Sequence, residues 1–509
     1  MTLIWLIERE VSRPGAIATV AATLFLSGCA VGPDFHHPAP PSLESYTRPS
    51  LAPTTASAEV PGGEPQHFAP DQQLSYEWWT LFESPPLNEL MRKALDASPT
   101  LIAAQAALRQ AVELVYAQQG AFYPTAVASF SPSYTKASNA LSPPLSTSQL
   151  TYSLFTLQGA LSYTPDVFGG IRRQVESLQG LAEAQIFQLQ ATYLTLTSSV
   201  ALAAIQEASL RAQIAATEEI IDISTRSLEL VRRQFALGAV ARLDVAAQEA
   251  ALAQVRQTLP PLQKQLEQTR NLLAALTGRF PSDDIEERFE FGTLHLPQDL
   301  PVGFPSTLVE HRPDVRAADA QLHAASAQIG VALANRFPQF TITAAAGGTS
   351  TALAQMFANG NPFWSVVGSL THTLFDGGTL LHRQRAAEAA FEQAAAQYRS
   401  TVINAFQSVA DAMHALQADA ETLKAAVAAE QAAKVTLDLT LTAQQLGAVN
   451  YLAVLSAQQA YRQVLLTRVQ AQAARFSDTV TLFQTLGGGS WNPPHVAADT
   501  TMRSAPPLE

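Results

Sequence analysis

Residues 379–446 read TLLHRQRAAEAAFEQAAAQYRSTVINAFQSVADAMHALQADAETLKAAVAAEQAAKVTLDLTLTAQQL, with neither Gly nor Pro at any position. Ala, Gln, Glu, Leu and Arg fill this run, and all five are strong helix formers. As one continuous helix the run would be roughly 100 Å long. Residues 171–237 form a second such run, with one Gly (Gly180) and no Pro. Helices of this length must pack along other helices.

Alanine dominates the apolar positions of both runs, so neighbouring helices can approach closely. We expect each long helix to have neighbours on both flanks, as in a barrel of helices. A dimeric or trimeric coiled-coil rod is the alternative, but a rod does not account for the strands described below.

The chain repeats itself, and the repeat gives the order of its elements. Leu237-Gly238-Ala239-Val240 recurs as Leu446-Gly447-Ala448-Val449. Each half therefore predicts a helix, two strands, a very long helix, a tip and a returning helix. The predicted domains are a signal peptide (1–28), a lipidated N-terminus with a Pro-rich tether (29–75), a first repeat (76–279), a connector (280–310), a second repeat (311–487) and a flexible C-terminal tail (488–509).

Glycine and proline mark the ends of the long helices. Gly238 and Gly447 are expected to stop the two long helices and to let the chain reverse. Pro260-Pro261 predicts a kink or a break in the first returning helix.

Four segments alternate between apolar and polar residues, as strands do. They are residues 125–135, 150–164, 340–346 and 364–374. Alternation over ~10 residues is typical of a transmembrane β-barrel, although an ordinary half-buried sheet shows it too. Four strands cannot close a barrel, and an open edge in lipid leaves backbone groups unsatisfied. Several chains must then share one barrel, and three chains would supply twelve strands.

The N-terminus has the features of an export and lipidation signal. Arg9 and Arg13 precede an apolar run at 16–26, which is too short to span a membrane. The run ends in Leu26-Ser27-Gly28-Cys29, the pattern of a lipoprotein cleavage site, so we expect acylation of Cys29. Ala30, in place of Asp, favours the outer membrane by analogy with lipoprotein sorting. The alternative is a buried or stray cysteine.

Composition excludes several classes of protein. Hydrophobic residues make up 47% of the chain and charged residues 15%, which is too apolar for a disordered chain. The net charge of −12 argues against nucleic-acid binding. With a single cysteine, no intramolecular disulfide can form. No nucleophile, phosphate-binding or metal-ligand motif is present, so we expect no enzymatic activity, no catalytic residue, no cofactor and no metal.

Together these features resemble the outer membrane factor family, the TolC-like channels, and in particular its NodT-type efflux lipoproteins. The resemblance covers nearly the whole mature chain and rests on an ordered set of motifs. The motifs are Cys29-Ala30-Val31-Gly32-Pro33-Asp34-Phe35, Trp78-Trp79 with Phe82, Leu87 with Leu90, Arg312-Pro313-Asp314-Val315, Phe337-Pro338, Leu374-Phe375-Asp376-Gly377-Gly378 and Leu486-Gly487-Gly488-Gly489 with Trp491.

The resemblance implies an α+β membrane protein: a trimeric 12-stranded outer-membrane β-barrel with four strands per chain, continued by a long periplasmic α-helical barrel. It implies the channel of a tripartite efflux pump in a Gram-negative bacterium. This homotrimer would conduct small molecules, such as drugs or toxic organics. Its partners would be a periplasmic adaptor, or membrane fusion protein, and an inner-membrane efflux transporter. Neither the exported compound nor the class of transporter follows from the sequence.

The resemblance also places function at the helical tips. Adaptor contact is expected at Leu237, Gly238, Ala239, Val240, Leu446, Gly447, Ala448 and Val449. Candidates for a gate at the tip are Phe235, Asp244, Gln444 and Asn450. The second tip lacks the acidic groups common in the family, so hydrogen bonds and apolar side chains are the expected closure.

Two other functions remain open on the sequence alone. The outer channel of a type I protein secretion system shares the fold. A non-channel periplasmic scaffolding lipoprotein built on a coiled coil would share the helices and the lipid anchor.

Overall fold

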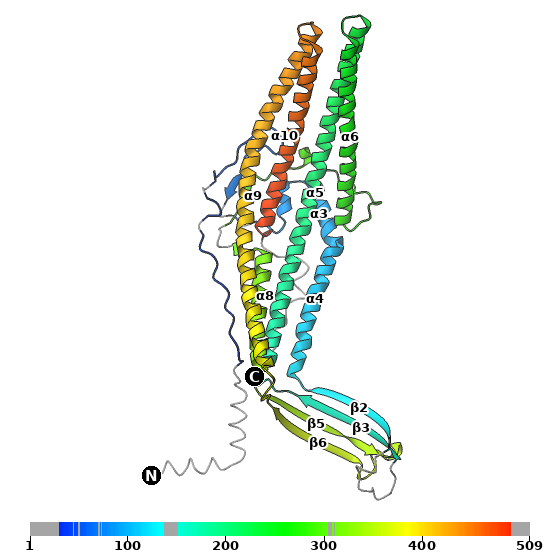
Figure 1. Cartoon of the computed structure of the whole chain (residues 1–509), viewed down its shortest axis with the longest axis vertical. Coiled ribbons are helices and arrows are strands. Elements are labelled where there is room, and N and C mark those ends of the chain that lie inside the picture. Colours follow the sequence, from blue (N-terminus) through cyan, green and yellow to red (C-terminus); the bar gives the residue numbers. More distant parts are fainter. Residues whose placement is uncertain are drawn as a thin grey trace, which may run out of the picture. The chain divides into compact units, whose positions relative to one another are not determined.

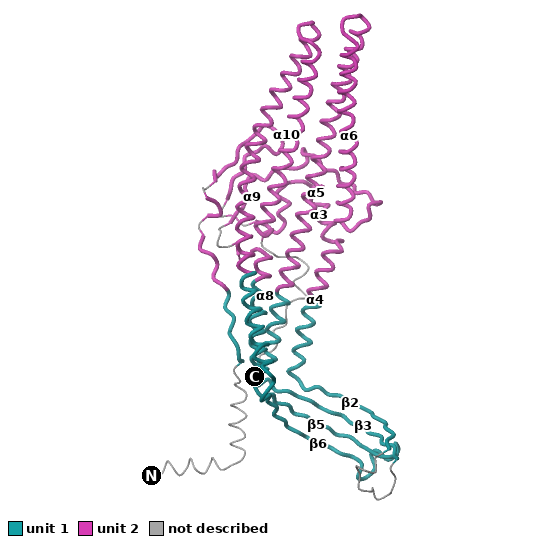
Figure 2. The backbone as a smooth tube through the Cα atoms, in the orientation of Figure 1, with its two compact units in different colours: residues 1–37, 109–183, 319–397 teal, residues 38–108, 184–318, 398–509 magenta. Residues whose placement is uncertain are grey.

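A computed structural model describes residues 30–43, 45–48, 51–69, 72, 74–136, 151–303, 308–309 and 311–489. These residues divide into two compact units (Figure 2). Unit 1 takes residues up to 37 together with 109–183 and 319–397, and unit 2 takes the rest. The predicted signal peptide, Cys29, residues 137–150 and Trp491 lie outside the described residues.

Unit 1 contains a four-stranded antiparallel sheet in the order β2-β3-β5-β6. The strands are β2 (Thr125–Lys136), β3 (Thr151–Tyr163), β5 (Gln339–Ser350) and β6 (Pro362–Thr371). β3 pairs with both β2 and β5, so the two halves of the chain meet in one sheet (Figure 1). Large apolar side chains such as Phe130 and Trp364 are exposed on this sheet, as the alternating pattern predicts for strands that face lipid.

The helices appear twice in the same order. The first set is α4 (Pro99–Gln119), α5 (Gly170–Ala236) and α6 (Arg242–Leu276), and the second is α8 (Pro313–Ala334), α9 (Thr379–Gln445) and α10 (Tyr451–Thr485). α5 and α9 each have 67 residues, and α6 and α10 each have 35. The same order of helices and the equal lengths of the α5/α9 and α6/α10 pairs show that the chain is an internal duplication.

α6 continues through Pro260 and Pro261, without the break that these two residues predict. Both prolines are exposed, as are residues 256 and 257, whose carbonyls lose their helical partners. Water can hydrogen-bond to those carbonyls, so the two prolines destabilise this helix less than they would destabilise a buried one.

The core of unit 2 is aromatic. α3 (Pro85–Ala97) and the short helix η1 (Trp78–Phe82) pack there, and β1 (His67–Ala69) pairs in parallel with β4 (Asp299–Pro301). Trp78 is fully buried, with its ring centroid 5.7 Å from that of Phe483 on α10. The Trp-Trp motif of the sequence therefore anchors the N-terminal part of the unit. No helix of the described residues has both the length and the apolar character needed to cross a membrane.

Candidate functional site

The two helical tips in unit 2 share one backbone turn. Ala239 N donates to Gln234 O at 2.9 Å, and Ala448 N donates to Ala443 O at 2.8 Å. Gly238 and Gly447 have φ of 75° and 72°, the left-handed region that glycine adopts without a steric cost. This hydrogen-bond pattern is the Schellman motif, which ends a helix and reverses the chain.

The returning helices begin with opposite halves of one capping arrangement. At the first tip the Asp244 carboxylate accepts from Ala241 N at 3.0 Å. At the second tip the Asn450 side chain accepts from Ala453 N at 3.1 Å. Asp244 and Asn450, two of the candidate gate residues, are thus engaged as helix caps.

Polar contacts join α5 to the second hairpin below the tips. Gln444 Nε2 lies 3.3 Å from Gln234 Oε1, and Gln444 is buried. Further down, Gln458 Nε2 donates to Ser227 Oγ at 2.7 Å. Gln444 is therefore the candidate gate residue that links the two hairpins directly.

Tyr451 packs between the hairpins and was not predicted from the sequence. It is buried with Val231 and Val454 at the first turn of α10. Burial, and secondly the nearby Asp244 charge, raise the pKa of its phenol, which stays neutral. A tyrosine directly after the second tip was the only sequence signal for this contact.

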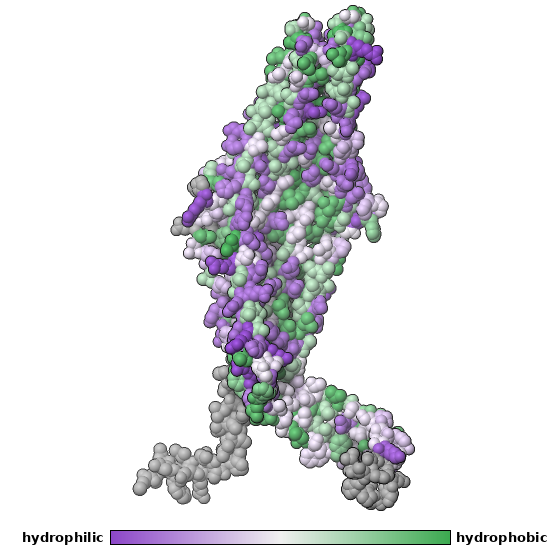
Figure 3. All heavy atoms as spheres, in the orientation of Figure 1, coloured by the Kyte–Doolittle hydropathy of each residue, from purple (hydrophilic) through white to green (hydrophobic). Residues whose placement is uncertain are grey.

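Exposed leucines lie at both tips. Leu237 and Leu446 are 85% and 81% exposed, and Leu243 and Leu452 are 77% and 67% exposed. The members of each pair occupy equivalent positions of the duplication. Phe235, the remaining gate candidate, is half exposed beside them. Figure 3 shows apolar side chains among the outermost residues of the tips. Large apolar side chains grouped in this way mark a surface that contacts another molecule.

The N-terminal family motif forms a strap on unit 1, defined here as residues 30–37. Arg173 of α5 donates to Val31 O at 3.2 Å and to Asp34 Oδ1 at 2.8 Å. Phe35 stacks on His323 of α8 with ring centroids 4.5 Å apart. Gly32 has φ of 107°, and a Cβ there would lie 2.5 Å from Gly330 Cα. These contacts explain the Val-Gly-Pro-Asp-Phe sequence physically.

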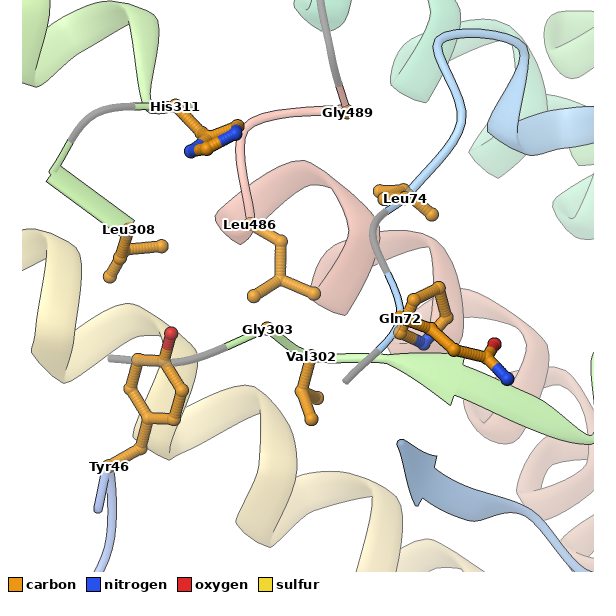
Figure 4. A pocket seen from close by; sticks show the side chains of 10 residues that line it. Tyr46, Gln72, Leu74, Val302, Gly303, Leu308, His311, Leu486 and Gly489 are labelled. Atoms are coloured by element: carbon orange, nitrogen blue, oxygen red, sulfur yellow. The ribbon is translucent and has the colours of Figure 1, made fainter. Parts of the chain in front are cut away.

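The pocket in Figure 4 carries no catalytic arrangement. It lies in unit 2 and is lined mainly by apolar residues, among them Leu74, Leu308 and Leu486, with His311 at its edge. Within the described ranges, no group of three or more His, Cys, Asp or Glu side chains is arranged to hold a metal ion.

Comparison with known proteins agrees with this architecture. The model of the outer membrane efflux protein family matches residues 90–279 and 304–488. The pyoverdine export outer membrane protein OpmQ of Pseudomonas putida is 29% identical over 409 residues, covering 79% of this chain and 82% of the relative. Nodulation protein T of Rhizobium leguminosarum bv. trifolii is 26% identical over 410 residues, covering 79% and 82%.

Solved structures agree as well. The outer-membrane channel OprN superposes with a TM-score of 0.79 at 26% identity, over 91% of this chain and 99% of that chain. The outer membrane protein VceC of Vibrio cholerae gives a TM-score of 0.75 at 27% identity, over 82% and 99%.

These matches confirm the predicted TolC-like fold, the outer-membrane location and the prediction that the protein is not an enzyme. The family model spans well over half of the chain and both of its repeats. The chain belongs to the outer membrane efflux protein family.

Proposed function

We propose that this chain is the outer-membrane channel subunit of a tripartite efflux pump. It would conduct small molecules to the exterior from an inner-membrane transporter and a periplasmic adaptor. One combination carries the proposal: a sheet whose two edge strands have no partner among the described residues, and two exposed helical tips in the same chain. Relatives named for pyoverdine export and toluene efflux support a small organic cargo.

A homotrimer would complete the membrane wall. β2 and β6 are the edge strands of the sheet, each paired on one side within the chain. In hydrocarbon each unsatisfied backbone group costs several kcal/mol, so such edges need partners. Three copies that join β2 of one to β6 of the next would close twelve strands into a barrel.

The strap supports a lipid anchor at Cys29. Val31 N donates to Phe168 O at 3.1 Å, and Ala30 contacts Gly169 just before α5. Ala30, the residue after the proposed anchor, therefore lies beside the segment that connects β3 to α5. This position suits an anchor in the same membrane as the strands.

We assign adaptor contact to the tip residues 237–240 and 446–449. The exposed leucines supply apolar surface for this contact, and the glycine turns present it. Closure of the tip would rest on the Gln234–Gln444 hydrogen bond and on Phe235. Asp244 and Asn450 would hold the helix ends.

Two measurements test the proposed function. The purified protein should conduct ions in planar bilayers, and Gln444→Ala should raise the conductance by loosening the tip. Ala239→Cys and Ala448→Cys should form cross-links to a periplasmic adaptor in cells. Ala253→Cys, on an exposed position of α6, serves as the matched control. Trimers that never conduct, or tips that cross-link no adaptor, would contradict the proposal.

A further inference from the structure

The two tips share a backbone but differ in charge. Residues 226–249 around the first tip contain four arginines and three carboxylates, whereas the equivalent residues 435–458 contain one charged side chain, Asp438. The two tips have the same turn and the same exposed leucines, so their main difference is the number of charged side chains.

Half of the arginines at the first tip have partners within the chain. Arg226 forms an ion pair with Asp222, and Arg232 Nη2 lies 2.6 Å from Glu249 Oε1. Arg233 and Arg242 are both exposed, and neither has a carboxylate within ion-pair distance in the described part of the chain. The first tip therefore carries two exposed guanidinium groups that form no ion pair within the described residues.

The position of Arg242 is unfavourable for the fold. It is the first residue of α6, where the helix dipole already places partial positive charge. A cation there weakens the helix, so α6 gains nothing from this side chain. Arg233, in the last turn of α5, lies where a cation is tolerated.

The second tip offers a different chemistry. Thr442 and Tyr451 stand at the positions equivalent to Arg233 and Arg242. Val435 and Leu439 on α9 are 57% and 66% exposed and extend the apolar surface of the second tip. The second tip is therefore apolar and without cations.

We propose that the partner of these tips, the periplasmic adaptor, presents carboxylates to Arg233 and Arg242 at the first tip and an uncharged apolar surface to the second. The two tips are then not interchangeable, and charge fixes which adaptor surface meets which tip. This inference rests on the proposed adaptor contact and adds the chemistry of its partner.

Association kinetics test the inference. The probe is the purified adaptor captured by Ala239→Cys, and the channel is the full-length protein in detergent. The Arg233→Gln/Arg242→Gln variant should associate about tenfold more slowly in ~50 mM salt, and the difference should vanish near 0.5 M. Arg226→Gln/Arg232→Gln removes the same charge from the same hairpin and should stay within about twofold of wild type. Arg233→Lys/Arg242→Lys should restore the rate.

Each other outcome has a distinct meaning. Equal rates for the two glutamine variants would overturn the inference while the adaptor contact stands. Loss of the trimer in Arg233→Gln/Arg242→Gln would also overturn it, because the arginines would then pair with a second copy of the chain. A wild-type channel that captures no adaptor would end the proposed function, and this inference with it.

Discussion

Because unit 2 contains a partly buried pair of carboxyl groups, we expect the free energy of unfolding to depend on pH near neutrality. Asp478 of α10 shares a hydrogen bond with Asp419 of α9, and burial together with this contact raises the pKa of Asp478 to about 7. The buried charge that interacts with Asp419 is Arg475 on α10, which also interacts with Glu64 of the N-terminal segment. Arg475 is fully buried, and its Nη2 donates to Glu64 O at 2.9 Å. Ionisation of both aspartates would therefore disturb a buried polar cluster.

The sign of the effect follows from the raised pKa. The folded state holds the proton more tightly than the unfolded state, whose aspartate has a pKa of about 3.9. The stabilisation is full below about pH 3.9 and is lost as the pH rises through about 7. Between pH 8 and pH 6 an unscreened group would gain about 1.4 kcal/mol. Partial solvent screening of Asp478 reduces this gain to about 0.5–1 kcal/mol per chain.

Asp478→Asn isolates this contribution, because asparagine resembles the neutral acid. The variant should be more stable than wild type at pH 8.5, by about 1–2 °C in melting temperature, and this gap should narrow as the pH falls and close below about pH 3.9. Asp438→Asn, an exposed position on α9, is the control and should shift no melting temperature. Thermal unfolding of detergent-solubilised protein across this pH range measures the difference. A constant gap between Asp478→Asn and wild type at every pH would refute the reasoning.

Three further substitutions test local structure. Gly32→Ala should release the strap, because the new Cβ would lie 2.5 Å from the backbone of Gly330 and residue 32 has a φ of 107°. Protease cleavage within residues 30–37 should then rise at least several-fold over wild type. Gly447→Ala meets no atom within 4 Å, so it should cost only the backbone strain of about 1 kcal/mol, seen as a small drop in melting temperature. Asn450→Ala should cost about 1 kcal/mol through the lost cap, and Asn450→Asp should retain it; faster hydrogen exchange confined to the first turn of α10 would report the loss.

Much of the fold could be predicted because it follows from local patterns. The Gly- and Pro-free run predicted α9 to within a residue at its end, and the alternating segment at 125–135 became β2. The repeated Leu-Gly-Ala-Val tetrapeptides located both turns. These features depend on neighbours a few positions apart, where propensity and periodicity act.

The polar contacts could not be predicted because they depend on distant parts of the chain. Arg475 reads as a solvated residue on a helix, yet Thr55, Glu64 and Gln66, about four hundred positions earlier, enclose its guanidinium. Asp244 read as a gate candidate, but its carboxylate caps α6. A carboxylate three residues into a helix signals a cap from sequence alone, and that signal was available.

The duplication separates what the tips need for folding from what they need for recognition. Both tips have glycine at the turn, a polar cap on the returning helix and two exposed leucines. The glycine and the cap are needed for a long helix to end and the chain to reverse. At the first tip the carboxylate of Asp244, the third residue of α6, accepts from Ala241 N, whereas at the second tip Asn450, just before α10, accepts from Ala453 N. Each returning helix is therefore capped, but by a different hydrogen bond. Charge at the tips is under no such constraint. Arg242 opposes the dipole of its own helix, and the carboxylates proposed for the adaptor would offset that cost.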